Sequence, residues 1–157
     1  ARAHPIGLHK VRLLVDERLR ITVEAAPLPD TPHPARVALA TQPMPPADAF
    51  IRHKTTRREP YEAARAEFSK EEADEVILLN ERGEVCEGTI TNIFAEAADG
   101  MLLTPPLTSG LLPGVLRAEL IRERKARGEV LKLDDLRHRK LFVGNSLRGL
   151  IPAELVE

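Results

Sequence analysis

The sequence predicts an α+β fold built on a mixed, possibly barrel-like sheet. Segments of strand length outnumber helical segments, and the predicted helices fall between pairs of strands joined by short turns. The 157 residues are 43% hydrophobic, which is enough for one core or for two small cores that share an interface. One or two domains are therefore expected.

The first third of the chain predicts strands separated by connectors. Two β-rich runs, residues 11–15 and 19–23, flank the turn residues 16–18 and predict a hairpin with one solvated face. Residues 37–40 predict a further strand between two proline-rich segments. We interpret residues 27–50 as this strand plus a connector.

The middle of the chain predicts one helix followed by two hairpins. The helix spans about residues 60–69, because Pro60 suits a first turn and Tyr61, Ala64 and Phe68 recur at helical spacing. The strands of the two hairpins are predicted at residues 76–79, 84–86, 91–95 and 101–104. The first hairpin delivers Glu87 at its end, and the centre of the chain is expected to be an antiparallel sheet.

The last third alternates helices and strands. We predict a helix at residues 115–127, a strand at 130–133, a short charged helix at 134–139 and a strand at 141–143. Gly128 is expected to end the first helix, and the last strand runs into Gly144-Asn-Ser146.

Charge and cysteine content exclude several classes of function. The 23 Lys and Arg residues nearly balance 24 Asp and Glu residues, so a formal charge of −1 offers no long-range attraction to nucleic acid or anionic membrane. The single cysteine, Cys86, cannot form an internal disulfide. Without a signal-peptide pattern or an apolar run of membrane-spanning length, we expect a cytoplasmic chain with neither nucleic-acid nor membrane partners.

Four segments contain residues suited to chemistry, although each also has an ordinary structural interpretation. The basic run at residues 52–58 suits a solvated face, and Glu87-Gly-Thr89 suits a turn with a solvated carboxylate. Leu112-Pro-Gly-Val115 is an ordinary helix start and Gly144-Asn-Ser146 a common turn. The last two could nevertheless offer hydrogen-bond donors to a phosphate group.

In this order, the motifs resemble the signature of class IV pyridoxal-phosphate enzymes. They read Glu-Gly-Thr-Ile-Thr-Asn-Ile-Phe at residues 87–94, Leu-Thr-Pro-Pro-Leu at 103–107 and Leu-Leu-Pro-Gly-Val-Leu-Arg at 111–117. The family includes branched-chain and D-amino acid aminotransferases and 4-amino-4-deoxychorismate lyase. The resemblance extends from Lys54 to the end of the chain.

The resemblance implies a pyridoxal 5'-phosphate site. Lys54 would be the Schiff-base lysine, whose freed amine could move the Cα proton of the substrate. Glu87 would keep the pyridine nitrogen protonated. The other cofactor-binding residues that the resemblance implies are Thr91, Asn92, Val115, Leu116, Asn145 and Ser146. We assign no metal ligands.

Further segments of the sequence resemble one branch of the family in particular. The run at residues 50–58 with Tyr61, together with residues 11–15 and 23–28, resembles the lyase-like domain fused to aminodeoxychorismate synthase. This resemblance implies a lyase of the folate pathway that converts 4-amino-4-deoxychorismate to 4-aminobenzoate and pyruvate. Alternatives are an aminotransferase for branched-chain or D-amino acids, or a truncated domain that folds and dimerises with weak catalysis.

The same resemblance predicts the domain organisation. Only 53 residues precede Lys54, fewer than in complete family members, so we expect a truncated N-terminal α/β domain. Residues 1–50 would be its remnant and connector, and residues 51–157 a cofactor-binding pseudo-barrel domain of the D-amino acid aminotransferase-like fold. The family implies a homodimer that acts on a small amino acid-like substrate.

Overall fold

The chain divides into two compact units, residues 1–31 and 32–157. The computed structural model describes residues 7–44 and 49–156. The two units divide between Thr31 and Pro32, whereas the domain organisation expected from the sequence had its boundary at residue 50. The difference comes from residues 35–39, which form a strand of the second unit's sheet.

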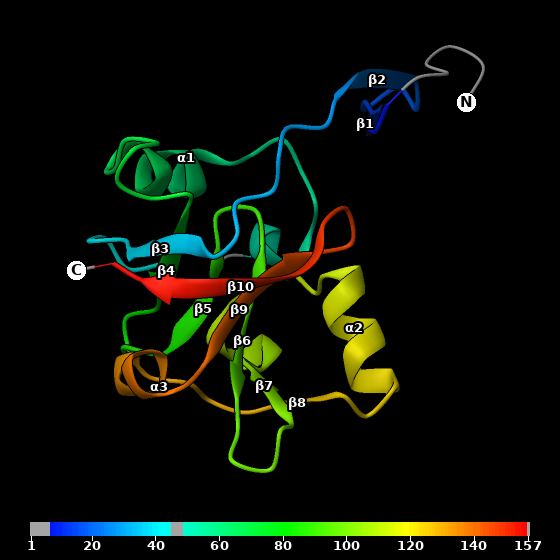
Figure 1. The fold of residues 1–157 in the computed structure, drawn as a ribbon. Coiled ribbons are helices and arrows are strands. Elements are labelled where there is room, and N and C mark those ends of the chain that lie inside the picture. Colours follow the sequence, from blue (N-terminus) through cyan, green and yellow to red (C-terminus); the bar gives the residue numbers. More distant parts are fainter. Residues whose placement is uncertain (1–6, 45–48, 157) are drawn as a thin grey trace. The chain divides into compact units, whose positions relative to one another are not determined.

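The first unit is the predicted hairpin. Strands β1 (His9–Val15) and β2 (Ile21–Pro27) pair antiparallel along their whole length (Figure 1). Leu13 pairs with Val23, and these two side chains on the apolar face are 61% and 62% exposed. Alternation predicted one solvated face; in the described residues both faces of the hairpin are solvent-exposed.

The second unit is built on an eight-stranded mixed sheet. Its strands are β3 (Ala35–Leu39), β4 (Glu75–Leu79), β5 (Val85–Gly88), β6 (Asn92–Glu96), β7 (Leu102–Thr104), β8 (Ala126–Gly128), β9 (Leu141–Asn145) and β10 (Gly149–Leu155). The order is β5-β4-β3-β10-β9-β6-β7-β8. β3 runs parallel to β4 and β10, and β7 runs parallel to β8, while the other pairs are antiparallel. The predicted mixed sheet is confirmed.

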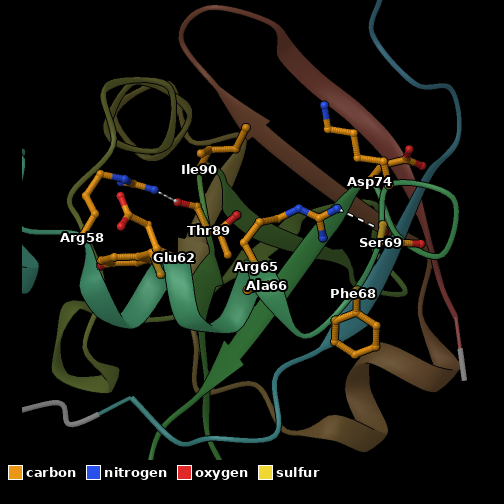
Figure 2. A pocket seen from close by; sticks show the side chains of 11 residues that line it. Arg58, Glu62, Arg65, Ala66, Phe68, Ser69, Asp74, Thr89 and Ile90 are labelled. Carbon is orange, nitrogen blue, oxygen red and sulfur yellow. Dashed lines mark hydrogen bonds between the residues drawn. The ribbon is translucent and has the colours of Figure 1, made fainter.

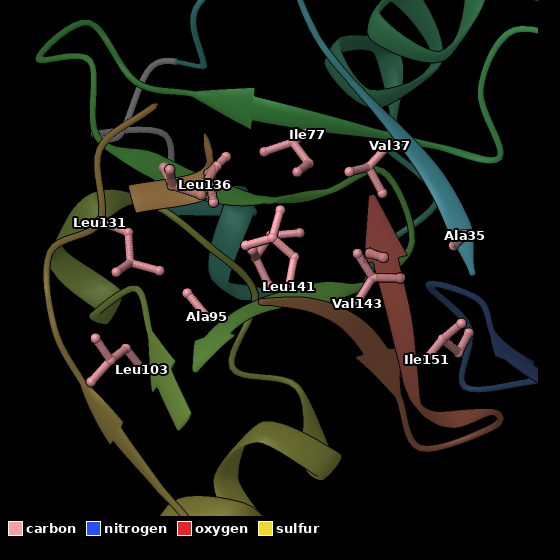
Figure 3. Packing of buried hydrophobic residues seen from close by; sticks show 13 residues of the cluster. Ala35, Val37, Ile77, Ala95, Leu103, Leu131, Leu136, Leu141, Val143 and Ile151 are labelled. Atoms are coloured by element: carbon pink, nitrogen blue, oxygen red, sulfur yellow. The ribbon is translucent and has the colours of Figure 1, made fainter. Parts of the chain in front are cut away.

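The sheet curls so that one face encloses a core, as the barrel-like prediction required. The edge strand β5 contacts β6, which lies five strands away in the sheet order. Ile77, Ala95 and Val143 come from three different strands and pack in one buried cluster inside the curl (Figure 3). Since side chains alternate between the two faces of a strand, their neighbours point outward and need separate cover.

Helices supply that cover. The helical segments are η1 (Ala49–Arg52), α1 (Glu59–Ala66), η2 (Leu107–Ser109), α2 (Val115–Arg122) and α3 (Leu133–His138). Val76 and Leu78 of β4 pack with Ala64 of α1, and Phe94 of β6 packs with Leu120 of α2. Within the described ranges, no helix is long and apolar enough to cross a membrane.

The predicted helix at residues 115–127 is too long. α2 ends at Arg122, and Arg124 adopts a left-handed backbone with φ of 59° that turns the chain back. Ala126–Gly128 then pairs in parallel with β7. Residues 126 and 127, which the hydrophobic pattern assigned to the helix, therefore belong to the edge strand β8. Tertiary pairing therefore overrides local propensity here.

The predicted strand at residues 130–133 is also wrong, and one strand was missed. Only Lys132 forms a β-bridge, to Glu84, while Leu133 opens α3. Leu131, one of the apolar residues on which the strand prediction depended, is buried in the core without belonging to a strand. β10 was not predicted, although it lies at the centre of the sheet between β3 and β9.

Candidate functional site

Glu87 is a buried carboxylate rather than the solvated turn residue of the simpler interpretation. It lies in β5 and is 4% exposed. Its Oε1 accepts hydrogen bonds from the Tyr61 hydroxyl at 2.7 Å and from the Leu112 N–H at 3.0 Å. Burial raises the pKa of Glu87 to about 7, against the opposing effect of these hydrogen bonds and of the Lys54 charge.

Lys54 lies on the exposed loop between η1 and α1. The positive charge of Lys54 lowers the pKa of the Glu87 carboxyl. Two residues at the start of α1 fasten this loop to β5 and the turn that follows it: Tyr61 bonds Glu87, and Arg58 Nη2 donates to the Thr89 carbonyl at 2.6 Å. The predicted basic run is therefore partly structural.

Glu75 is a second buried acid that sequence reasoning missed. It is 3% exposed, and its carboxylate accepts hydrogen bonds from the Thr89 N–H at 2.9 Å, the Ile90 N–H at 3.1 Å and the Thr91 hydroxyl at 2.8 Å. The hydroxyl of Thr91 is thus committed to Glu75. The only signal in the sequence was an acid directly before the apolar run at 76–79, which resembles the end of the preceding charged stretch.

Gly88, at the end of β5, has to be glycine because the chain passes close to the Glu75 carboxylate there. A Cβ at Gly88 would lie 2.5 Å from Thr91 Oγ1 and 2.8 Å from Glu75 Cδ. Only glycine lets the strand that carries Glu87 approach the Glu75 carboxylate so closely. Hydrogen bonds to the buried Glu75 carboxylate therefore stabilise the turn between β5 and β6.

The start of α2 presents free backbone donors. Ala118 N–H donates to Gly114 O in the first turn, and the N–H groups of Val115 and Leu116 precede the first intrahelical donor. The first turn contains no acidic residue, so the positive end of the helix dipole is not neutralised. Val115 is 69% exposed.

Asn92 packs against this helix start. A Cβ at Gly114 would lie 2.0 Å from Asn92 Oδ1, so glycine is needed there. Asn92 Nδ2 donates to Leu112 O at 3.1 Å, while Leu112 N–H donates to Glu87. The peptide groups of Leu112 thus connect the buried carboxylate to the helix start.

The turn after β9 lies beside the same helix start. Asn92 pairs with Gly144 across the sheet, and a Cβ at Gly144 would lie 2.9 Å from Leu116 Cδ2. Asn145 Oδ1 accepts from two backbone N–H groups of its own turn, and Asn145 Nδ2 donates to Ile90 O at 3.2 Å. Ser146 is exposed in this turn. The structure therefore brings the two predicted phosphate-binding segments together.

A separate open groove runs along α1. Its volume is about 500 Å³, and Tyr61 forms part of its wall. Arg58 and Thr89, which also line it, are joined by a hydrogen bond (Figure 2). Arg65 also lines it and donates to Ala73 O at 2.8 Å. The eight site residues predicted from the sequence are not among its lining residues.

The profile of the family described as amino-transferase class IV matches residues 6–156. The chain therefore belongs to the class IV aminotransferase family. This family assignment agrees with the mixed sheet and with the side chains gathered around Glu87 and the start of α2.

Individual relatives show similarity to both aminotransferases and a lyase. A Mesorhizobium loti protein of known structure, assigned as an amino-acid aminotransferase, is 48% identical, with a TM-score of 0.91 over 94% of this chain and 73% of that chain. A Thermotoga maritima protein assigned as a branched-chain-amino-acid aminotransferase is 44% identical over 33% of this chain and 19% of its own. A Schizosaccharomyces pombe protein assigned as an aminodeoxychorismate lyase is 33% identical over 58% of this chain and 40% of its own. Both matches to these curated relatives span less than half of the relative's length.

Proposed function

We propose that the second unit binds pyridoxal 5'-phosphate and that Lys54 binds its aldehyde. The observation that supports this most strongly is the connection through Leu112, which places a buried carboxylate and a helix start at the two ends of one hydrogen-bonded path. The cofactor carries an aldehyde, a pyridine nitrogen and a phosphate. An amine for the aldehyde, a carboxylate for the protonated pyridine nitrogen and free backbone N–H groups for the phosphate are the partners that those three groups require.

Each residue has a role that its surroundings support. Bound pyridoxal phosphate supplies an electron-withdrawing ring that stabilises negative charge next to a substrate amine. Lys54 would bind the aldehyde and afterwards take up and return a proton at the substrate Cα. Glu87 would hold a proton on the pyridine nitrogen, and the hydrogen bonds that it accepts from Tyr61 and Leu112 favour the ionised carboxylate that this role needs.

The phosphate would be held mainly by backbone groups. Val115 and Leu116 would donate from the start of α2, with Asn145 and Ser146 completing the cup. Asn92 would support this cup from the sheet side, because it packs against Gly114 and pairs with Gly144. Thr91 would act indirectly, through its bond to Glu75.

Our first choice of reaction is the lyase reaction, in which 4-amino-4-deoxychorismate gives 4-aminobenzoate and pyruvate. The sequence around Lys54 and the lyase assignment of the S. pombe relative support it. Transamination of branched-chain or D-amino acids is the alternative, supported by the T. maritima relative. A weakly catalytic, dimerising domain is a third proposal, because the matches to the T. maritima and S. pombe relatives cover only 19% and 40% of those proteins.

Two assays separate these proposals. Protein incubated with pyridoxal phosphate and dialysed should keep a visible absorption band that Lys54→Ala abolishes. A band of equal strength in Lys54→Ala would contradict the assignment of Lys54. Release of 4-aminobenzoate and pyruvate without an amino-group acceptor would support the lyase, whereas turnover only with a 2-oxo acid acceptor would support the aminotransferase.

The setting of the enzyme is proposed on the same basis. The family resemblance supports a cytoplasmic homodimer acting in folate biosynthesis. Sedimentation velocity at several concentrations would test the dimer, since the molar mass derived for a homodimer would be twice the 17.4 kDa of one chain.

A further inference from the structure

Both hydrogen bonds that the described residues donate to Glu87 end on the same oxygen. The Tyr61 hydroxyl and the Leu112 N–H both reach Oε1, at 2.7 and 3.0 Å. The carboxylate is therefore oriented from one side, and Oε2 is the oxygen left to face a ligand. One of the two donors is the backbone N–H of Leu112, which every residue except proline would supply, so Tyr61 is the donor that depends on the identity of a side chain.

The ring of Tyr61 is held in place by Arg58. The Arg58 guanidinium lies 5.0 Å from the centroid of the ring and donates to the Thr89 carbonyl at 2.6 Å. Tyr61 is in the first turn of α1, where Pro60 fixes the direction of the helix start. Burial and the nearby Glu87 carboxylate both raise the pKa of Tyr61, so its hydroxyl remains a donor.

We propose that Tyr61 is a positioning residue, whose hydroxyl fixes the rotamer of Glu87 and favours its ionised form so that Oε2 faces the pyridine nitrogen. The part concerning the pyridine nitrogen rests on the proposed function; the bond between Tyr61 and Glu87 does not. A carboxyl that stays protonated by burial cannot hold the proton of a pyridine nitrogen. A hydrogen bond donated to the carboxylate favours the charged form and opposes that burial effect.

The other charged groups around Glu87 act in both directions. Lys54, before α1, lowers the pKa of Glu87, and Glu75 of β4 raises it. Arg117 of α2 interacts with the Glu87 charge while burial lowers its own pKa, and Cys86 is the neighbouring residue on β5. None of these groups donates a hydrogen bond to Glu87 in the described structure, so Tyr61→Phe removes a distinct contribution.

The first test uses cofactor-free protein and therefore does not depend on the proposed function. Infrared difference spectra recorded across pH give the midpoint of Glu87 protonation from its carboxyl C=O band, which Glu87→Gln identifies by removing it. Tyr61→Phe should raise this midpoint by about one pH unit, the effect expected for one lost hydrogen bond. Thr22→Val, which removes an exposed hydroxyl on β2, should leave it unchanged. A midpoint in Tyr61→Phe equal to that of the starting protein would overturn the proposal.

The second test measures discrimination at the pyridine nitrogen. The dissociation constants of pyridoxal phosphate and of its 1-deaza analogue, in which a C–H replaces the nitrogen, are compared by equilibrium dialysis. Tyr61→Phe should weaken binding of pyridoxal phosphate by about tenfold, the effect of one hydrogen bond, and leave the analogue almost unaffected. An equal loss for both ligands would overturn the positioning role. If the starting protein binds neither ligand, the proposed function fails, and the infrared titration still decides the Tyr61–Glu87 coupling.

Discussion

At the scale of single residues, burial decides the chemistry of the two acids near the site. Glu75 and Glu87 are almost equally buried, yet Glu75 accepts hydrogen bonds from a whole turn, whereas Glu87 accepts two on one oxygen. The first is therefore engaged in holding the structure, and the second retains an oxygen for a ligand. Spacing along the chain does not distinguish these two situations.

Glu87 should make folding stability depend on pH in the cofactor-free protein. Its pKa is raised from 4.5 to about 7, so the folded state keeps a proton that the unfolded chain releases. The resulting contribution is fully favourable below pH 4.5 and is lost as the pH rises through about 7, a change on the order of 3 kcal/mol. Glu87→Gln removes this dependence. Urea unfolding at pH 5 and pH 8 should therefore show a relative gain for Glu87→Gln at the higher pH, and an identical pH dependence in both proteins would contradict the buried position.

Glu75 should be important for stability. Glu75→Ala leaves the Ile90 N–H and the Thr89 and Thr91 hydroxyls without this acceptor, whereas the Thr89 N–H keeps its bond to the Val76 carbonyl. The expected loss is about 3 kcal/mol or more of unfolding free energy, measured by urea titration. Glu71→Ala, at an exposed acid four residues earlier, serves as the matched control. Equal stabilities of the two variants would show that the turn does not depend on Glu75.

At the scale of elements, hydrophobic pattern was sufficient where strands and helices are bounded by turns. The hairpins of β1–β2, β4–β5 and β6–β7 and the start of α2 agree with the predictions. The pattern failed at Ala126–Gly128, because this segment pairs with β7 and local periodicity carries no information about such a long-range contact. It also missed β10, which forms a hairpin with β9 and pairs in parallel with β3, more than a hundred residues earlier in the chain.

The start of α2 allows a test of phosphate binding by backbone groups. Val115→Pro removes one N–H at the first helical position, where proline is tolerated, and Gly114 already has the extended backbone that a following proline requires. Stability should change little. Affinity for pyridoxal phosphate should fall about tenfold or more, the effect of one charge-assisted hydrogen bond.

Val115→Ala is the matched control for this change, because it shortens the same side chain and keeps the N–H. Dissociation constants from fluorescence titration with pyridoxal phosphate would compare the two variants. If Val115→Pro and Val115→Ala bind the cofactor equally well, the phosphate does not use the Val115 N–H.

At the scale of the whole molecule, the sequence predicted the mixed sheet and the family, and contact between distant segments supplied the rest. Residues 87–94, 111–117 and 144–146 are separated in sequence, and the structure joins them through Leu112, Asn92 and Gly144. Motif order could suggest this grouping only through the family resemblance. The part played by Tyr61 follows from a hydrogen bond between α1 and β5 that the motifs do not encode.

The most direct test of the account is to locate the covalent bond to the cofactor. Protein incubated with pyridoxal phosphate is reduced with borohydride, digested and mapped by mass spectrometry. We predict that the added mass of the reduced pyridoxyl phosphate group lies on the peptide containing Lys54 and disappears in Lys54→Ala. Stoichiometric label on another lysine, such as Lys70 or Lys125, with Lys54 unlabelled, would contradict the account.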